Sequence, residues 1–346
     1  MSVKKKLKAV DFFCCAGGVT NGFIKAGIQV LGGIDIEVAY KETYEKNNNG
    51  AKFIHADIAR ISPRSLHKKL GIVKRMDDLI FVGCSPCQYY TNMHTDKTKS
   101  KKSRLLLEDF KRFVDYYLPG YIFIENVPGL DTRIQSPLSK FKRFLSRKGY
   151  VFDERVVNAA AYNVPQNRRR YILLASRVNE EILVPLSKNK RVKTVRDTIG
   201  SLKPISAGHK DDKDNKHWTA KLEEINIRRI EKTSKDGGTR LEWKDDSELQ
   251  LKCYIGKDDT FPDVYGRMHW DLPSPTITTK FYSITNGRFG HPEQNRALSI
   301  REGAMLQSFP RSYNFYSDNL ALVAKMIGNA VPPELSKQIA RAFLNS

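Results

Sequence analysis

Short apolar runs alternate with amphipathic stretches over about the first 175 residues of the chain. Runs of strand length, separated by segments of helical periodicity, are typical of a parallel α/β sheet. The pattern predicts strands at Lys8–Cys14, Val30–Asp35, Lys52–His55, Leu79–Gly83, Tyr121–Glu125 and Arg170–Ala175. Between these strands it predicts helices at Asn21–Ala26, Val38–Asn47, Ser103–Tyr117 and Pro137–Arg147.

The pattern changes near residue 180. From there to about residue 290 the chain is polar and rich in turns, and its strand patterns are weak. Helical periodicity returns at Ile300–Leu306 and Pro333–Leu344. We therefore predict a larger α/β domain at residues 1–180, completed by a C-terminal segment at 311–346. A smaller, irregular domain with a return segment is predicted at 181–310.

The net charge of the chain indicates what kind of molecule it binds. The 346 residues include 59 Lys and Arg against 38 Asp and Glu, a net charge of +21 spread along the chain. This excess favours a polyanion such as DNA or RNA, although a basic protein from a lysine-rich organism would look similar. The five cysteines are odd in number, and no secretory segment or long apolar run accompanies them. These features predict a soluble intracellular protein with free thiols.

Three successive predicted strands end in residues that suit a nucleoside. Asp11–Gly18 closes the first strand and opens a helix, and its small residues let the backbone approach a ligand, although tight strand–helix turns also need Gly for steric reasons. Asp35 ends the next strand and suits a ribose diol. Asp57 and Ile58 follow the third strand and suit the edge and face of adenine. No phosphate-binding loop is present, so the expected cofactor is S-adenosylmethionine.

A thiol follows the fourth predicted strand, in Cys84-Ser-Pro-Cys87. Catalytic groups often lie in loops at the carboxyl ends of parallel strands. A redox pair or half of a zinc site would use the same spacing. The chain offers no further ligands at metal-like spacing, so no metal is predicted.

The fifth predicted strand ends in Glu125, where burial should raise the pKa and allow the carboxyl group to hold a proton. A structural carboxylate that caps the next turn is the alternative. Arg168 and Arg170 belong to a basic cluster before the sixth strand, and strand alternation would point both to one face. A solvated basic turn would also account for this cluster.

These segments, in their order and spacing, resemble the DNA (cytosine-5) methyltransferases from about residue 8 to residue 344. The resemblance rests on Phe13-x-Cys-Ala-Gly17-Gly18, Pro86-Cys87-Gln88, Glu125-Asn126-Val127, Gln166-x-Arg168-x-Arg170 and Gly328-Asn-Ala-Val-Pro332. It implies the Rossmann-like fold of adenosylmethionine-dependent methyltransferases, with a mostly parallel sheet. Residues 1–180 would be catalytic and cofactor-binding, and 181–310 would form the target-recognition domain.

The resemblance also implies roles for single residues. Cys87 would attack a flipped-out cytosine, Glu125 and Arg168 would hold the base or favour the thiolate, and Arg170 would support Glu125. The cofactor pocket would comprise Phe13, Ala16, Gly17, Gly18, Asp35, Ile36, Asp57, Ile58, Pro86, Asn329 and Ala330. The chain departs from the family at three positions, with Cys15 and Leu105 where Gly is usual and Ile36 where an aromatic residue is common. Ile36 should therefore weaken cofactor affinity without abolishing activity.

DNA contacts are expected from the loop after Cys87 and from the recognition domain. Residues 89–104 combine basic and small polar side chains, as in a flap that closes over phosphates, although a solvated surface loop has the same composition. The expected contacts are Gln88, Thr91, Lys97, Lys99, Lys101, Lys102, Arg104, Arg240 and Lys280.

The leading hypothesis is a monomeric bacterial enzyme that methylates double-stranded DNA in the nucleoid, beside a restriction endonuclease for the same site. The absence of a regulatory extension favours it. A transfer-RNA methyltransferase of the same fold is one alternative, but Cys253 lacks the Phe-Thr that follows the corresponding Cys in those proteins. An inactive DNA-binding homologue is another. It would be expected to lack Cys87, Glu125 or Arg168, and all three are present.

Overall fold

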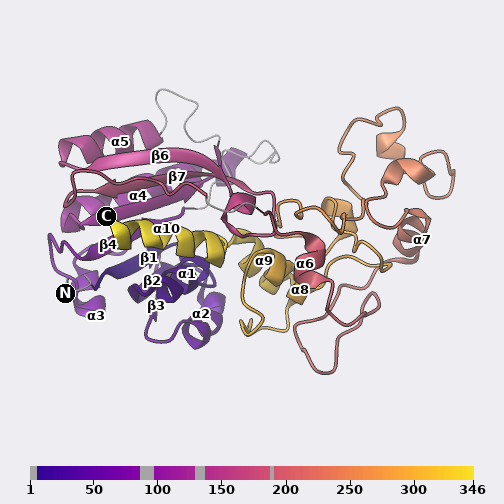
Figure 1. The fold of residues 1–346 in the computed structure, drawn as a ribbon, viewed down its shortest axis with the longest axis horizontal. Helices are drawn as coiled ribbons and strands as arrows, with labels where there is room; N and C mark the ends of the chain where they lie inside the picture. Colours follow the sequence, from indigo (N-terminus) through magenta and orange to yellow (C-terminus); the bar gives the residue numbers. More distant parts are fainter. Residues whose placement is uncertain (1–5, 86–96, 129–136, 188–190) are drawn as a thin grey trace. The chain divides into compact units, whose positions relative to one another are not determined.

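Two units make up the chain in the computed structural model (Figure 1). The structure describes residues 6–85, 97–128, 137–187 and 191–346, with the backbone alone for residues 97–104. The sheet unit comprises Met1–Tyr162, Arg169–Lys188 and Ala330–Ser346. The inserted unit comprises Asn163–Arg168 and Asn189–Asn329. The sheet unit thus includes the C-terminal residues 330–346, whereas residues 311–329 belong to the inserted unit.

A seven-stranded sheet forms the centre of the sheet unit. Its strands are β1 (Lys8–Phe12), β2 (Gln29–Asp35), β3 (Lys52–His55), β4 (Leu79–Gly83), β5 (Tyr121–Asn126), β6 (Val151–Asn158) and β7 (Arg169–Ser176). They lie in the order β3-β2-β1-β4-β5-β7-β6, with β7 antiparallel to both of its neighbours and the other pairs parallel. The prediction of a mostly parallel sheet is confirmed. The carboxyl ends of β1 to β5 therefore meet at one edge.

The predicted sheet lacked β6, the strand at one edge. Its middle residues are Asp153, Glu154 and Arg155, and most of the strand is partly or fully exposed. Charged side chains on both faces hide the alternation that identifies a half-buried strand. An edge strand of this kind therefore leaves little signal in the sequence.

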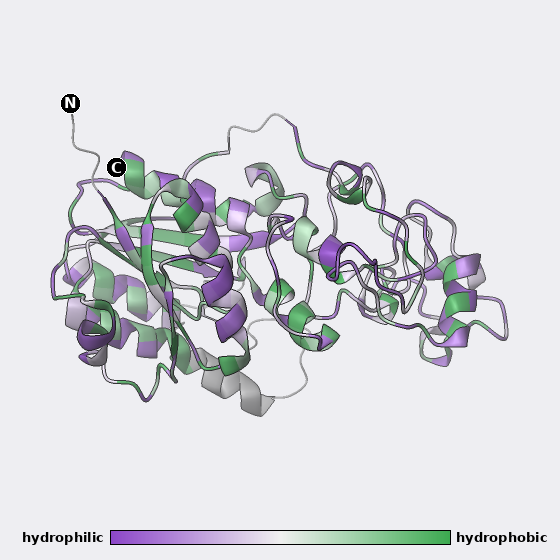
Figure 2. Ribbon diagram, turned by 90° about the horizontal axis from the view of Figure 1, so that it is seen from below, coloured by the Kyte–Doolittle hydropathy of each residue, from purple (hydrophilic) through white to green (hydrophobic). Residues whose placement is uncertain are grey.

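Helices cover both faces of the sheet. Those of the sheet unit are α1 (Gly18–Ala26), α2 (Lys41–Asn47), α3 (Ser65–Leu70), α4 (Lys97–Tyr117), α5 (Pro137–Arg147) and α10 (Pro333–Asn345). On β5, Ile122 and Ile124 join the core cluster that includes residues of α4, whereas Phe123 stacks on Phe23 of α1 with ring centroids 6.0 Å apart. Figure 2 shows the strands in green between helices that are green on one side and purple on the other. The alternation of β5 thus produces three layers.

Helix α10 completes the layer that contains α1, and Figure 1 shows the two in yellow and indigo beside each other. Gly22 permits their close approach, because a Cβ atom there would lie 2.4 Å from the carbonyl oxygen of Pro333. Two predicted helices begin earlier than expected: α1 at Gly18 and α4 at Lys97. In contrast, Val38–Tyr40 forms a separate 3-10 turn before α2.

The inserted unit is irregular, as predicted. Its helices are α6 (Val195–Ile199), α7 (Glu224–Lys232), α8 (Ile300–Leu306) and α9 (Leu320–Asn329). Its described residues form isolated β-bridges instead of strands. A small apolar cluster around Ile230, Trp243 and Ile284 is one part of its interior. Arginines such as Arg267 and Arg296 are also buried in this unit.

Candidate active site and cofactor pocket

Glu125 lies near the carboxyl end of β5, beside the strand that leads to Cys87. Its side chain is buried, and its Oε1 accepts a hydrogen bond from Nε of Arg170 at 2.9 Å. Glu125 lies opposite Ile172 on β7, so Arg170 is its diagonal neighbour on the same face of the sheet. A second guanidinium nitrogen of Arg170 donates to the carbonyl of Arg169 at 2.7 Å. This arrangement orients the carboxylate and agrees with the supporting role predicted for Arg170.

The loop that carries Cys87 follows β4. Pro86, Cys87, Gln88 and Thr91 lie outside the described residues, so their roles stay predictions. The same holds for the side chains at the start of α4, Lys97, Lys99, Lys101, Lys102 and Arg104.

Cys84 is the other thiol of the Cys-x-x-Cys segment. Burial raises its pKa well above the ordinary value, and the carboxylates of Glu125 and Asp11 raise it further. A thiol that stays protonated is a poor nucleophile. The surroundings of Cys84 therefore favour Cys87 as the reactive thiol.

Arg168 precedes β7 and belongs to the inserted unit. Its side chain is buried, and its guanidinium donates to the carbonyls of Ile277 at 3.2 Å and Gly328 at 3.3 Å. These bonds connect three distant segments of the inserted unit. The predicted effect of Arg168 on the Cys87 thiolate stays a prediction.

The turn after β1 has an unusual backbone. Phe13, Cys15 and Gly17 all have left-handed conformations, with φ angles of 63°, 47° and 87°. Glycine adopts this region without strain, whereas a residue with a Cβ atom does so at a cost. The strand consequently ends at Phe12, and the prediction that it continues to Cys14 is wrong. The conformation also gives a physical reason for the glycine that the family usually has at position 15.

Gly18 begins α1 against the segment that precedes α10. A Cβ atom at Gly18 would lie 2.3 Å from the carbonyl oxygen of Val331 and 3.1 Å from Cβ of Ala330. The glycine is therefore needed to bring these two backbones together. Of the predicted pocket residues, Phe13, Ala16, Gly17, Gly18 and Ala330 gather here in the sheet unit, whereas Asn329 ends α9 in the inserted unit.

Asp35 ends β2 and joins two loops at the edge of the sheet. Its Oδ2 accepts the N–H of Cys15 at 2.9 Å, and its Oδ1 accepts the N–H of Glu37 at 3.0 Å. Burial raises the pKa of Asp35, while these backbone hydrogen bonds lower it. Each carboxylate oxygen has further lone pairs, so the predicted ribose contact is compatible with this structural role.

Asp57 and Ile58 lie in the turn after β3. Oδ1 of Asp57 accepts the N–H of Ala59 at 2.9 Å, and Ile58 is buried in the core cluster beneath the sheet edge. Ile36, after β2, is instead 64% exposed. An apolar side chain with this exposure is available to cover one face of a planar ring.

Asp11 is a site candidate that the sequence predictions did not include. It is buried within β1, and Thr20 donates a hydrogen bond to its Oδ2 at 2.8 Å. Its Oδ1 is buried without a hydrogen-bond partner among the described residues. Burial raises the pKa of Asp11 to about 7. An acidic residue inside an otherwise apolar strand, directly before the turn, was the available signal.

Arg240 in the inserted unit differs from its prediction as a DNA contact. Only 2% of the residue is exposed, and its guanidinium donates to the carbonyls of Lys257, Asp258 and Thr260 at 2.8 to 3.1 Å. These contacts favour a structural role, because the groups that would bind a phosphate hold a loop. Lys280 is exposed, as its prediction requires.

Buried ion pairs and arginines form the polar interior of the inserted unit. Arg296 makes two hydrogen bonds of 2.7 Å to Glu302, and Arg267 donates to four backbone carbonyls. Burial raises the pKa of Glu302, but Arg296 and neighbouring groups outweigh it and bring the pKa down to about 2. Burial lowers the pKa of His291 to about 4. The burial of Arg267 and Arg296 could not be predicted from the sequence, because a basic residue gives the same signal at the surface and in the interior.

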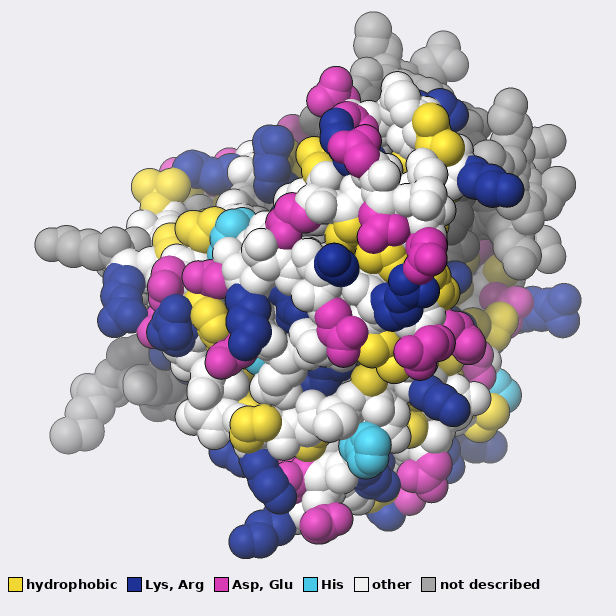
Figure 3. Space-filling view, turned by 90° about the vertical axis from the view of Figure 1, so that its right-hand side faces the viewer, with side chains coloured by type: hydrophobic (Ala, Val, Ile, Leu, Met, Phe, Trp, Pro, Cys, Tyr) yellow, Lys and Arg dark blue, Asp and Glu magenta, His cyan; other side chains and the backbone are white. Residues whose placement is uncertain are grey.

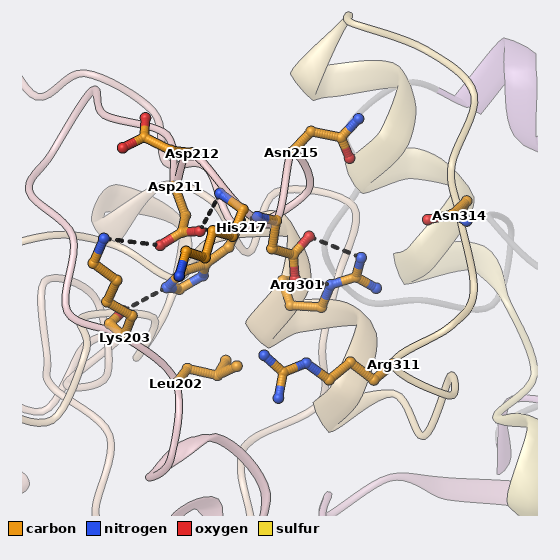
Figure 4. A pocket seen from close by; sticks show the side chains of 11 residues that line it. Leu202, Lys203, Asp211, Asp212, Asn215, His217, Arg301, Arg311 and Asn314 are labelled. Atoms are coloured by element: carbon orange, nitrogen blue, oxygen red, sulfur yellow. Dashed lines mark hydrogen bonds and ion pairs between the residues drawn. The ribbon is translucent and has the colours of Figure 1, made fainter.

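A polar cavity of about 610 Å³ opens on the inserted unit (Figure 4). Arg301 pairs with Asp214 at 2.8 Å, and Lys203 approaches Asp211 at 3.6 Å. His217 contacts the carbonyl of Lys203 at 2.7 Å. Most charges in the cavity are paired with each other, so it offers no field of one sign to a ligand.

The outer surface of the inserted unit shows the same mixture. In Figure 3, Lys and Arg side chains in dark blue alternate with Asp and Glu in magenta. The net charge of +21 therefore does not gather into one basic patch on this face.

Comparison with known proteins identifies the family. The family description "C-5 cytosine-specific DNA methylase" matches residues 7–345, nearly the whole chain. The chain belongs to this family of DNA methylases. A relative from Herpetosiphon aurantiacus, Type II methylase M.HgiDII, is 38% identical over 340 residues, with 96% of this chain and 94% of the relative covered. Type II methyltransferase M1.BsuMI of Bacillus subtilis is 30% identical, with 97% and 80% covered.

Solved structures support the fold of the methylase. A prophage-encoded DNA modification methyltransferase from E. coli matches with a TM-score of 0.76 and 19% identity, covering 98% of this chain and 99% of that one. The S. pombe Dnmt2 methyltransferase matches with a TM-score of 0.66 and 18% identity. The predicted enzyme class, DNA (cytosine-5) methyltransferase, and the adenosylmethionine-dependent methyltransferase fold are confirmed.

Two kinds of feature are absent from the described part of the methylase. None of its helices is long and apolar enough to cross a membrane. No group of three or more His, Cys, Asp or Glu side chains with the arrangement of a metal site occurs in that part.

Proposed function

We propose that this methylase transfers a methyl group from S-adenosylmethionine to carbon 5 of a cytosine in duplex DNA, through a covalent adduct with Cys87. The observation that carries the proposal is the ion pair of buried Glu125 with partly buried Arg170, with 2.9 Å between Oε1 and Nε. Glu125 lies on β5, next to β4, the strand that leads to Cys87, and Arg170 lies on β7, on the other side of β5. A paired base cannot reach buried groups, so the cytosine must flip out of the helix.

The residues at the ends of β1 to β3 fit the adenosyl cofactor. A buried carboxylate oxygen of Asp11 has no hydrogen-bond partner in the described part of the chain and suits an ammonium group. At Gly18 a Cβ atom would collide with the backbone of Val331. Asp35 would hold the ribose, and Asp57, Ile58 and Ile36 would surround adenine. Phe13, Ala16, Gly17, Pro86, Asn329 and Ala330 would complete the pocket. The cofactor supplies a methyl group on positively charged sulfur.

The side chains of the methylase then act on the base. The Cys87 thiolate adds to carbon 6, which forms an S–C bond and moves the electron pair of the double bond towards carbon 5. Glu125, oriented by Arg170, hydrogen-bonds N3 and the exocyclic amine and stabilises the charge that develops. After carbon 5 has taken the methyl group, loss of its proton restores the double bond and expels Cys87. Arg168 favours the thiolate.

Relatives with 38% and 30% identity are named as Type II methylases, which supports a role in restriction-modification. We propose that the enzyme protects bacterial DNA from a cognate restriction endonuclease and works as a monomer in the cytoplasm, at the nucleoid. Lys280, Gln88 and Thr91 contact DNA, and so do basic side chains at the start of α4. These basic side chains are Lys97, Lys99, Lys101, Lys102 and Arg104.

Mass spectrometry of nucleosides tests this function after incubation of the protein with duplex DNA and methyl-labelled S-adenosylmethionine. We expect labelled 5-methylcytosine in DNA, and none with Cys87→Ser. Cofactor and DNA binding by Cys87→Ser should stay near wild type. Label in transfer RNA but not in DNA would contradict the proposed substrate, and turnover by Cys87→Ser would contradict the covalent mechanism. Bisulfite sequencing of DNA from expressing cells then identifies the target site.

A further inference from the structure

Arg112 on α4 contacts the turn that carries Asp57 and Ile58. Its Nη2 lies within hydrogen-bond distance of three carbonyl oxygens, at 2.6 Å from Ile58, 3.2 Å from Ile61 and 3.3 Å from Ala59. Three carbonyls from one short turn thus converge on one nitrogen. Arginine suits this geometry because its planar group presents several N–H donors in fixed directions.

The turn also has internal bonds that connect Arg112 to Asp57. Ala59 accepts from Arg112 through its carbonyl and donates its N–H to Oδ1 of Asp57 at 2.9 Å. The guanidinium therefore acts on the same peptide segment that orients the Asp57 carboxylate. A change at Arg112 should move Asp57 through this segment.

Charged side chains of α4 and of the turn also interact. Asp109 precedes Arg112 by about one helical turn, and partial burial raises its pKa. The positive charge of Arg112 opposes this rise, whereas the Asp57 carboxylate adds to it. The charges of α4 and of the turn therefore act on one another.

A second contact fixes the continuation of the segment to α4. The hydroxyl of Tyr117 donates to the carbonyl of Pro63 at 2.7 Å and accepts the N–H of His67 at 3.0 Å. Helix α4 starts at Lys97, shortly after Cys87 in the sequence. Helix α4 thus follows Cys87 in the sequence, and its Arg112 and Tyr117 bind the backbone of the segment after β3.

We propose that Arg112 is a positioning residue for the cofactor. It fixes the turn at residues 57–61 so that Asp57 and Ile58 meet adenine, and it connects this turn to the helix that follows Cys87. The inference rests on the proposed use of Asp57 and Ile58 as cofactor contacts.

Steady-state kinetics and equilibrium binding of S-adenosylmethionine test the role, with Arg112→Ala, Arg112→Lys and a control. In Arg112→Ala we expect Kd and KM for S-adenosylmethionine to rise about tenfold, while kcat and KM for DNA change less than about twofold. Arg112→Lys should recover part of the affinity for S-adenosylmethionine, since lysine keeps the positive charge but lacks the planar guanidinium with its several N–H donors. Lys111→Ala is the control, because Lys111 is adjacent and pairs with Glu108 on the same helix.

A double-mutant cycle with Asp57→Ala distinguishes positioning from general loss of stability. If Arg112 acts through the Asp57 turn, Arg112→Ala should weaken cofactor binding much less in the Asp57→Ala background. Additive effects, or an unchanged Kd in Arg112→Ala, would overturn the role of Arg112 while wild-type methylation of DNA stands. Wild-type affinity in Asp57→Ala would instead overturn the proposed adenine contact, and the inference with it.

Discussion

The two units of the methylase build their interiors in different ways. In the sheet unit, apolar layers cover the sheet, and the buried oxygen Oδ1 of Asp11 has no hydrogen-bond partner among the described residues. In the inserted unit, Arg267 and Arg296 are almost fully buried, and every polar atom of their guanidinium groups has acceptors nearby. Regular strands support the first unit, whereas side-chain hydrogen bonds to backbone replace them in the second.

Asp11 and the two arginines therefore differ in whether their substitution should change activity or folding stability. An unsatisfied buried group costs free energy, and it persists where it serves a ligand. A satisfied ion pair holds a fold but is costly to break from one side. Substitutions in the sheet-unit pocket should therefore affect chemistry first, and substitutions in the interior of the inserted unit should affect folding first.

The largest expected effect is catalytic. Glu125→Gln keeps the size of the side chain but loses the carboxylate, so methylation should fall at least about a hundredfold. The melting temperature should change by less than about 3 °C, as for a substitution that leaves packing intact. Arg155→Ala removes an arginine from β6 that pairs with Asp153 at 3.2 Å, and it serves as the control with unchanged activity. If both variants lost methylation activity equally, Glu125 would have no specific role in catalysis.

The next effect is on stability. Arg296→Met leaves the Glu302 carboxylate buried without its bidentate partner, which should cost about 3–5 kcal/mol of unfolding free energy. Denaturant unfolding measures this cost. Adding Glu302→Leu should recover part of it, because the buried charge is then removed as well. If Arg296→Met alone unfolds like the wild type, the ion pair does not support the inserted unit.

The pH dependence of stability should have opposite signs in the two units. The pKa of His291 is lowered to about 4 from an ordinary 6.5, so its contribution is complete above pH 6.5 and is lost as pH falls towards 4. The pKa of Asp11 is raised to about 7 from 3.8, so its contribution is complete below pH 3.8 and is lost as pH rises towards 7. Each group contributes about 3–4 kcal/mol over its range.

Unfolding of the cofactor-free protein as a function of pH, monitored separately in each unit, measures these slopes. Asp11→Asn should flatten the slope in the sheet unit and leave that of the inserted unit unchanged. His291→Gln should do the reverse. A common slope in both units, insensitive to either substitution, would show that other groups control the pH dependence.

The smallest expected effect concerns Cys15. Its φ angle of 47° strains any residue with a Cβ atom, so Cys15→Gly should stabilise the protein by up to about 1 kcal/mol, less the added entropy of the unfolded glycine. Ala16→Gly is the matched control, since Ala16 does not have a positive φ angle and should only lose stability. Differential scanning calorimetry compares the two. A lower melting temperature in Cys15→Gly would mean that thiol packing outweighs backbone strain.

The sequence predicted the sheet unit well because its signals are local and periodic. The strands at Lys52–His55 and Leu79–Gly83 have their predicted bounds, and Glu125 lies at a strand end as expected. The errors have physical causes, such as left-handed backbone that ends β1 at Phe12 and charges that hide β6. The support of Glu125 by Arg170 was expected from the family resemblance, and alternation along the strand did not by itself separate Arg170 from Arg168.

The inserted unit could be predicted only as irregular. Arg240 looked like a phosphate ligand, yet its guanidinium binds carbonyls of residues 257–260. A basic side chain carries the same sequence signal whether it faces DNA or the interior, because no periodic pattern surrounds it. Helix α9 was missed for a related reason, since its apolar residues follow a turn-rich segment.

The contact between α1 and α10 has a consequence for biosynthesis. During translation, residues 163–329 leave the ribosome before the 330–346 segment that packs against Gly22. The sheet unit must therefore wait, with one face of its first helix uncovered, until the inserted unit has been made. A nascent chain that ends within the inserted unit lacks α10 and therefore cannot assemble this layer.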